Sequence, residues 1–269
     1  MKEATLKALL GAPSGIKMRT GTHARIYGRE GSRARLMARE SASVAGTYTS
    51  SDVLEPIAYQ GSGIARLASA PVVELAREHK ACLSELGSMS GLILRREDTL
   101  ISSGASALSV PVTFGASMPI VLAPAIALNL DALGESVDLI VDDDALVVSG
   151  EQYRLSTPLR TGTEGYDFTP APGFSVRLDE LRKACDAGSP SQVWEFGPQT
   201  LRIDGTVVTS ARDGDSRHLV MRLDRKLVLP LIRKLASARE NVHVSAASSR
   251  RVVLRAGERA AAIAPLRSI

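Results

Sequence analysis

A unit of one amphipathic helix followed by several alternating strands recurs four times along this chain of 269 residues. Its clearest copy covers residues 117–159, where SMPIVLAPAIALNLDALGES predicts a leading strand and a helix, and VDLIVDDDALVVSGEQYRLSTP predicts three short strands. The other copies cover 64–113, 174–211 and 219–266, so the four begin about fifty residues apart. Each strand alternates apolar and polar residues, which allows helices to cover one face of an antiparallel sheet. We therefore predict an α+β fold of repeated helix-plus-antiparallel-strand units.

A segment without hydrophobic period separates the second copy from the third. Residues 160–173, RTGTEGYDFTPAPG, are rich in Gly, Pro and Thr, which is typical of an interdomain connector. The copies therefore group into two predicted domains, 63–163 and 174–269, joined by a linker at 164–173. Residues 1–62 fit the scheme less well and form either a basic N-terminal segment or an unpaired half-unit.

Positive charge is concentrated at the start of the chain. Residues 1–50 contain nine Lys or Arg and three acidic residues, which gives +6, whereas the rest of the chain sums to −2. This distribution suits contact with a polyanion through part of the surface, although a solubilising basic face is an equally simple interpretation. Aromatic residues make up only 4% of the chain, so base stacking on an aromatic platform is not expected.

Sequence motifs give no support for an enzyme. The chain has no G-x-x-x-x-G-K-[ST], no H-E-x-x-H and no G-x-S-x-G, and its four histidines lie at no metal-ligand spacing. Consecutive Asp142, Asp143 and Asp144 favour a hairpin turn over a metal site. We therefore predict a protein without catalytic activity, metal or cofactor.

The two cysteines and the hydropathy pattern indicate a cellular compartment. Cys82 and Cys185 fall in amphipathic helical stretches, which predicts buried free thiols in a reducing environment. No apolar run reaches the eighteen or so residues needed to span a membrane. A cytoplasmic protein without membrane contact is expected.

Three stretches resemble one known family in their order and pattern. They are SGLILRREDTLISSGASALSVPV at 90–112, VVSGEQYRLSTPLRTGTEGYDFTP at 147–170, and residues 223–269, which end in Pro265-Leu266-Arg267. These stretches are similar to those of the sliding clamps of DNA replication, most closely the bacterial β clamp and more distantly the eukaryotic and archaeal clamp. The resemblance covers about residues 63–269 and implies the DNA-clamp fold, with helices lining a ring and sheets outside.

The resemblance also implies a function. A sliding clamp is a polymerase processivity factor that encircles duplex DNA without sequence preference and tethers replication or repair proteins through short peptide tails. Rings of this kind close with about twelve units, so four units per chain imply a homotrimer, and a clamp loader is the expected assembly partner. The protein would then be cytoplasmic and associated with the nucleoid. The alternative is a clamp-folded regulatory subunit that recruits partners without encircling DNA alone.

Candidate binding residues follow from the resemblance and from the predicted helices. DNA-facing charges would be Arg77, Lys80, Arg182, Lys183, Lys226, Arg233 and Lys234, although basic helix residues can equally form a solvated face. The partner-peptide pocket would be lined by Asp224, Leu227, Pro265, Leu266 and Arg267, although both leucines could be ordinary core.

Three features depart from the family pattern. Ala264 stands where the pocket usually has a larger residue, the predicted helix at 121–134 has no Lys or Arg, and Pro230 falls inside the last predicted helix.

Overall fold

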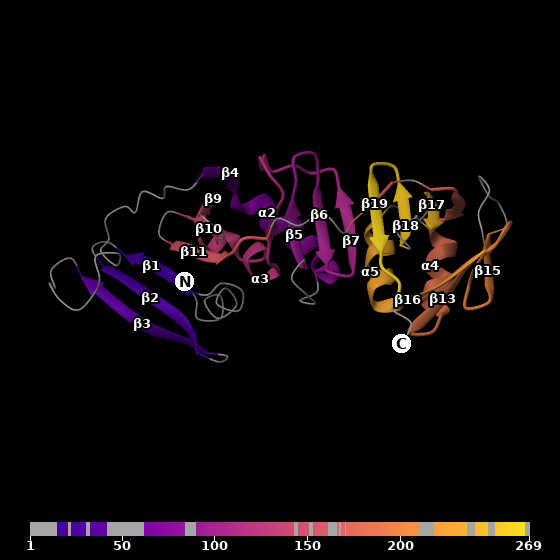
Figure 1. Ribbon diagram of the computed structural model, residues 1–269, viewed down its shortest axis with the longest axis horizontal. Helices are drawn as coiled ribbons and strands as arrows, with labels where there is room; N and C mark the ends of the chain where they lie inside the picture. Colours follow the sequence, from indigo (N-terminus) through magenta and orange to yellow (C-terminus); the bar gives the residue numbers. More distant parts are fainter. Residues whose placement is uncertain are drawn as a thin grey trace. The chain divides into compact units, whose positions relative to one another are not determined.

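The structure is a computed structural model that describes residues 15–20, 23–30, 33–41, 62–83, 90–142, 145–150, 153–160, 166, 168–169, 171–209, 218–235, 240–246 and 251–266 (Figure 1). The chain divides into two compact units. Unit 1 comprises Met1–Glu78, Leu94–Arg96 and Thr113–Thr161, and unit 2 comprises His79–Ile93, Glu97–Val112 and Gly162–Ile269. Helices and antiparallel strands alternate along the chain, which confirms the predicted α+β class. The predicted domain bounds stay a prediction.

Unit 1 is built on a seven-stranded antiparallel sheet in the order β3-β2-β1-β11-β10-β9-β4. Its strands are β1 (Gly15–Thr20), β2 (His23–Glu30), β3 (Arg33–Ser41), β4 (Ser62–Ala68), β9 (Ser136–Asp142), β10 (Ala145–Ser149) and β11 (Tyr153–Pro158). The N-terminal strands join the second copy through β1 and β11, with Gly15 opposite Ser156. The segment that fitted the repeat poorly therefore contributes three strands in consecutive order.

The helical part of unit 1 is short. Helix α2 (Ser69–Glu78) buries Val72, Val73 and Ala76, while β8 (Ile120–Leu122), α3 (Pro124–Ala127) and the 3-10 turn η3 (Leu130–Ala132) follow later in the chain. The single helix predicted at 121–134 is thus broken in two. Pro124 begins α3, and Asn129 stops it with a φ of −130° while its side-chain amide donates to the carbonyl of Ala125 at 2.8 Å.

Unit 2 contains two groups of antiparallel strands. The first has the order β12-β17-β18-β19-β7-β6-β5 and the second β15-β14-β13-β16. Their bounds are β5 (Ser90–Leu94), β6 (Thr99–Ser103), β7 (Ser106–Val110), β12 (Gly173–Arg177), β13 (Ser191–Phe196), β14 (Leu201–Ile203), β15 (Thr206–Thr209), β16 (Leu219–Asp224), β17 (Asn241–Ala246), β18 (Val252–Ala256) and β19 (Arg259–Ile263). A hairpin turn at Asp204 and Gly205 joins β14 to β15, where both residues have positive φ (48° and 79°), as tight Asp-Gly turns require.

Paired copies exchange their leading strands. In unit 1, β4 of the first copy pairs with β9 of the second. In unit 2, β12 of the third copy pairs with β17 of the fourth, and β16 of the fourth pairs with β13 of the third. Because each sheet is completed by a strand from the other copy, neither copy of a pair forms its sheet alone.

Two helices of unit 2 contribute apolar residues to its core. Helix α4 (Leu178–Ala187) buries Leu178, Leu181 and Cys185, and helix α5 (Arg225–Leu235) buries Val228, Leu231, Ile232 and Leu235. Pro230 lies inside α5, although it has no N–H to donate to the carbonyl four residues earlier. The helix nevertheless continues to Leu235, since its buried face is apolar along the whole length.

Described residues of the predicted linker are fixed to the strands of unit 2. The Tyr166 hydroxyl lies 2.6 Å from Ser102 Oγ, and the guanidinium of Arg251 lies 5.3 Å from the Tyr166 ring centroid. Arg255 Nη2 donates to the carbonyl of Phe168 at 3.0 Å. The linker therefore contacts both β6 of the first copy and β18 of the fourth. The strands of the first copy and those of the fourth copy are joined where β7 pairs with β19. We call this pairing the joint, and Tyr166 spans it.

Candidate DNA-contact face and partner pocket

Helix α4 exposes one stripe of charged side chains. Asp179, Arg182, Lys183 and Asp186 follow the spacing i, i+3, i+4, i+7, which places them on the same side of the helix. The Asp179 carboxylate accepts two hydrogen bonds from Arg177, at 3.0 and 2.9 Å. Desolvation acts to raise the pKa of Asp179, but the hydrogen bond and charge of Arg177, with smaller help from the Glu180 backbone and Lys183, outweigh it and hold the pKa below its ordinary value. The carboxylate stays charged and is balanced by its arginine.

Helix α5 contributes a second, more basic stripe. Lys226 and Arg233 are exposed and lie seven residues, about two helical turns, apart, and Lys234 is half-buried beside Arg233. The helix begins with a cap, because Asp224 Oδ1 accepts a hydrogen bond from the backbone N–H of Lys226 at 2.8 Å. Arg233 Nη2 lies 3.4 Å from Asp186 Oδ1, so the negative charge of Asp186 on α4 is balanced by Arg233 on α5.

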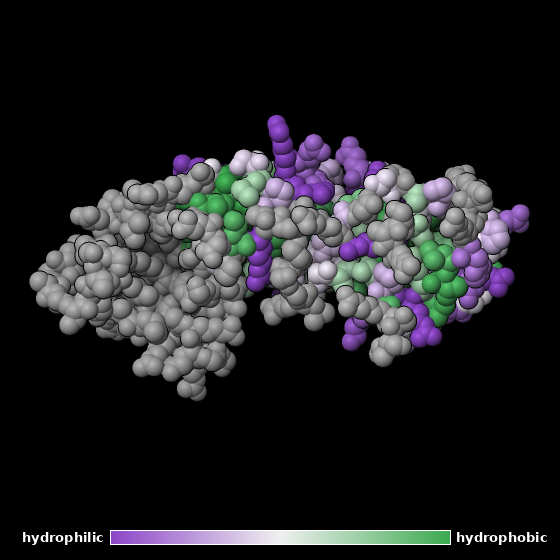
Figure 2. All heavy atoms as spheres, viewed as in Figure 1, coloured by the Kyte–Doolittle hydropathy of each residue, from purple (hydrophilic) through white to green (hydrophobic). Residues whose placement is uncertain are grey.

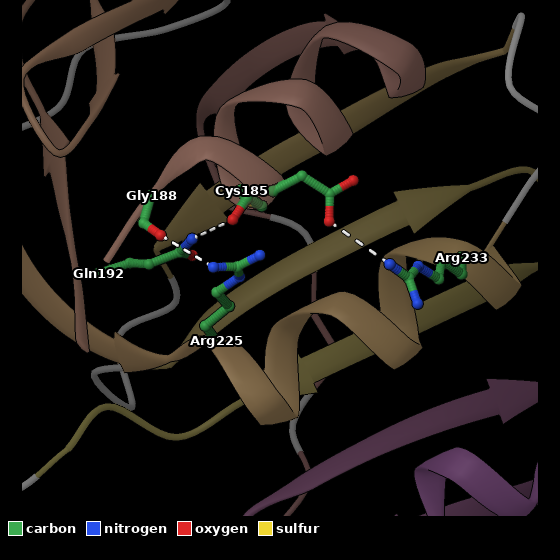
Figure 3. A network of polar contacts seen from close by, with 6 residues as sticks. Cys185, Gly188, Gln192, Arg225 and Arg233 are labelled. Carbon is green, nitrogen blue, oxygen red and sulfur yellow. Dashed lines mark hydrogen bonds and ion pairs between the residues drawn. The ribbon is translucent and has the colours of Figure 1, made fainter. Parts of the chain in front are cut away.

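A network of polar contacts ties the end of α4 to α5 (Figure 3). Gln192 Nε2 donates to the carbonyl of Cys185 at 2.6 Å, and Arg225 Nη1 donates to the carbonyl of Gly188 at 3.1 Å. The last carbonyls of a helix have no partner within it, so these side chains satisfy groups that would otherwise be orphaned. The network fixes the two helices beside each other, and we call their exposed surface, residues 177–187 and 225–235, the α4–α5 face.

The charge of the α4–α5 face is positive. Residues 177–187 contain three basic and three acidic side chains, whereas residues 225–235 contain four basic and no acidic ones, which gives +4 in total. The short 3-10 turn η2 (Lys80–Cys82) packs against α5 and adds the exposed Lys80. The structure therefore brings six of the seven predicted DNA contacts together in unit 2: Lys80, Arg182, Lys183, Lys226, Arg233 and Lys234.

The seventh predicted contact lies in unit 1 and in different surroundings. Arg77 ends α2, and its Nη2 lies 3.1 Å from Asp131 Oδ2. A shallow pocket of about 510 Å³ beside it is also lined by Glu74 and Glu78. Residues 69–78 and 124–135, which hold α2, α3, η3 and the turn after η3, together contain one basic and four acidic side chains, a sum of −3. The charge of Arg77 is thus offset by an acidic helical surface.

The predicted partner pocket falls on the C-terminal segment and β16. The backbone N–H of Leu266 donates to the carbonyl of Arg222 at 2.7 Å, which lays the segment along the outer edge of β16. Leu266 is 41% exposed and Val220 on β16 is 50% exposed, so apolar side chains reach the surface beside this edge. Asp224, Leu227 and Pro265 are half-buried, and Arg267 lies outside the described residues.

Two further features of unit 2 were not found from the sequence. Val220 belongs to the exposed side of β16, and only the strand's alternation, which buries Met221 and Leu223, could have indicated it. A depression of about 760 Å³ between α4 and the β14–β15 hairpin is lined by Lys183, Asp204 and Val207. The Asp204 carboxylate is already occupied by the backbone N–H groups of Val193 and Ser189, at 2.7 and 2.8 Å.

Neither cysteine is placed for chemistry. Cys82 and Cys185 are free and buried, as predicted from their helical positions. Burial raises the pKa of the Cys82 thiol to about 11, and burial likewise raises that of Cys185. Within the described ranges, no group of three His, Cys, Asp or Glu side chains could hold a metal ion, and no helix is long and apolar enough to cross a membrane.

Comparison with known proteins gives a match in structure but not in sequence. No protein-family model and no curated protein matches the chain. The sliding clamp of Caulobacter crescentus superposes with a TM-score of 0.55 at 13% identity, over 100% of this chain and 99% of the other. The DNA polymerase III subunit beta of Pseudomonas aeruginosa gives 0.55 at 10% identity over 98% and 97%.

A further solved structure is the Pseudomonas aeruginosa clamp bound to griselimycin, with a TM-score of 0.53 at 12% identity over 98% of this chain and 96% of the other. Identities this low establish the fold and leave the activity to be argued from the residues. Both partners of each superposition are covered almost completely. The chain therefore has the fold of the bacterial DNA polymerase sliding clamps.

Proposed function

We propose that the protein is a DNA sliding clamp, a processivity factor that encircles duplex DNA and tethers replication or repair proteins to it. The observation that carries the proposal is the end-to-end match of its fold to sliding clamps. The positive α4–α5 face adds a surface suited to phosphate, with lysine and arginine stems that contact any sequence alike. Such a protein holds DNA by containment, and its direct contacts are weak enough to allow sliding.

Closure of the ring requires several copies. Strands β3 and β15 end their sheets, so each offers backbone N–H and C=O groups to which another copy can add by strand pairing. Head-to-tail addition of this kind closes when the rotation per copy divides a full turn. Four repeated units favour a homotrimer, and the three N-terminal strands provide part of a fifth unit, so the mass in solution decides the number.

Partner proteins would bind at the C-terminal segment. The exposed Leu266 and Val220 provide apolar contacts beside the edge of β16 along which the C-terminal segment lies, and an extended peptide tail would bind over this surface. Deleting residues 265–269 is expected to leave the ring assembled and to abolish binding of clamp-binding peptides. Unchanged peptide affinity after the deletion would place the pocket elsewhere.

A specific observation favours the alternative function. Within the part of unit 1 that the structure describes, residues 69–78 and 124–135 sum to −3, whereas a surface that lines a DNA channel should attract phosphate. A clamp-folded regulatory subunit that recruits partners, and that does not encircle DNA alone, would need no such attraction. In either function the protein is a binding module without catalytic activity of its own.

Retention on circular DNA separates the two functions. The protein is placed on nicked circular plasmid with a clamp loader, or after mild denaturant opens the ring, and is washed at high salt. A clamp remains on the circle and is lost once a restriction enzyme linearises it, because the grip is topological while salt removes the phosphate contacts. Equal loss from both forms would favour the regulatory subunit.

A further inference from the structure

The cations of the α4–α5 face differ in whether they already have a partner. Arg177 and Arg233 are bound to Asp179 and Asp186, so they balance acidic residues within the protein. In the described part of the chain, the side chains of Arg182, Lys183 and Lys226 make no hydrogen bond or ion pair, and all three are exposed. Lys183 attracts Asp179 through its charge alone, so all three charges are available to an external anion without first breaking a hydrogen bond or an ion pair.

The helical surface of unit 1 has the opposite character. On the helices of unit 1 that the structure describes, the one basic residue is Arg77, which is bound to Asp131 at 3.1 Å. Glu74 and Glu78 of α2 are exposed, and so is Glu135 just after η3. Like charges repel through solvent over about one Debye length, roughly 8–10 Å at moderate salt. A phosphate that approached this surface would meet net negative charge.

From this contrast, and resting on the proposed function, we propose that the duplex is held by the α4–α5 face of unit 2 alone, through Arg182, Lys183 and Lys226, and that Arg77 makes no phosphate contact. Each copy in a ring then supplies one attractive face and one repelling face. The duplex contacts are confined to the attractive faces, which differs from a channel lined with positive charge throughout.

The salt dependence of DNA binding measures the number of phosphate contacts directly. The triple variant Arg182→Ala/Lys183→Ala/Lys226→Ala is titrated with a short fluorescein-labelled linear duplex over a range of salt concentrations. Each lost contact lowers the slope of log K against log[salt] by about 0.9, so the triple variant is expected to lose about 2.7. All three residues are exposed on helices, where alanine is well tolerated, and the melting temperature checks that the fold is kept.

Two single variants make the test specific. Arg202→Ala removes an exposed cation from β14, outside the helices, and should leave the slope unchanged. Arg77→Ala should also leave the slope unchanged, whereas a loss of about 0.9 would show that unit 1 contacts phosphate and would overturn the proposal. An unchanged slope in the triple variant would overturn it as well.

Failure of this proposal is distinguishable from failure of the clamp function. If the protein leaves circular and linear DNA equally but the triple variant still loses its slope, the α4–α5 face binds DNA and encirclement is wrong. If retention on circles persists while the triple variant keeps its slope, encirclement stands and the assignment of the face is wrong.

Discussion

Replacing Tyr166 should weaken the joint between the first and fourth copies before it affects the rest of unit 2. The Tyr166 side chain is 9% exposed, and burial of a ring with about 150 Å² of apolar surface at about 25 cal/mol per Å² contributes about 4 kcal/mol, an upper estimate. The hydroxyl contact with Ser102 adds about 1 kcal/mol. Tyr166→Ala should therefore cost about 4–5 kcal/mol and Tyr166→Phe only about 1 kcal/mol.

Amide hydrogen exchange locates this loss. Strands β7 and β19 pair with Ser109 opposite Ala260, and this pairing is the joint that Tyr166 spans. The amides of β7 and β19 should therefore exchange faster in Tyr166→Ala. Amides of β13, which pairs with β14 and β16, should keep their protection and serve as the internal control. Urea unfolding of Tyr166→Phe measures the hydroxyl alone. If Tyr166→Ala exchanges at wild-type rates in β7 and β19, the linker does not stabilise the joint.

Three further predictions concern buried polar groups. Gln192→Leu should destabilise the protein to urea by about 3 kcal/mol, since the Cys185 carbonyl and the Trp194 indole N–H both lose their partner; a loss under about 0.5 kcal/mol would contradict the capping role. Cys82 and Cys185 should resist iodoacetamide at pH 8 and react once urea unfolds the chain, because both are buried and carry raised pKa values; rapid native labelling, followed by mass spectrometry, would contradict this. Cys82 and Tyr166 should cause no loss of stability to urea up to about pH 9 and a fall as pH rises toward 11, since the Cys82 pKa is raised from 9.0 to about 11 and burial also raises that of Tyr166 from 10.0. A profile that stays flat from pH 9 to pH 11 would argue against burial of these groups.

The period of the hydrophobic pattern was enough to predict the fold class, because each copy repeats the same helix-and-strand order. It failed where one residue overrides the pattern, as at Asn129, which ends a helix that the apolar spacing would continue. The pattern placed Pro230 inside the last helix, where the structure has it, and apolar packing along the whole helix keeps α5 continuous to Leu235.

The candidate site was harder to predict, since it depends on contacts between residues far apart in the sequence. Arg77 and Lys80 look equivalent in the chain, but Asp131, 54 positions after Arg77, offsets only the first of them. Tyr166 and Ser102 are 64 positions apart, and no local pattern indicates that they meet. Sequence reasoning therefore found the basic helices and could not tell which of their charges are available.

The exchange of leading strands sets the order in which the chain can finish folding during synthesis. Strand β12 emerges from the ribosome well before its partner β17, with Gly173 opposite Ser245 and Arg177 opposite Asn241. Until residues 241–246 are made, the backbone N–H and C=O groups of β12 that later bond β17 have no partner in β17. An unpaired strand edge of this kind can pair with another nascent chain. Pairing between strands so distant in sequence is also slow. A translational pause before β17 should therefore lower the yield of soluble protein, whereas a pause after it should not.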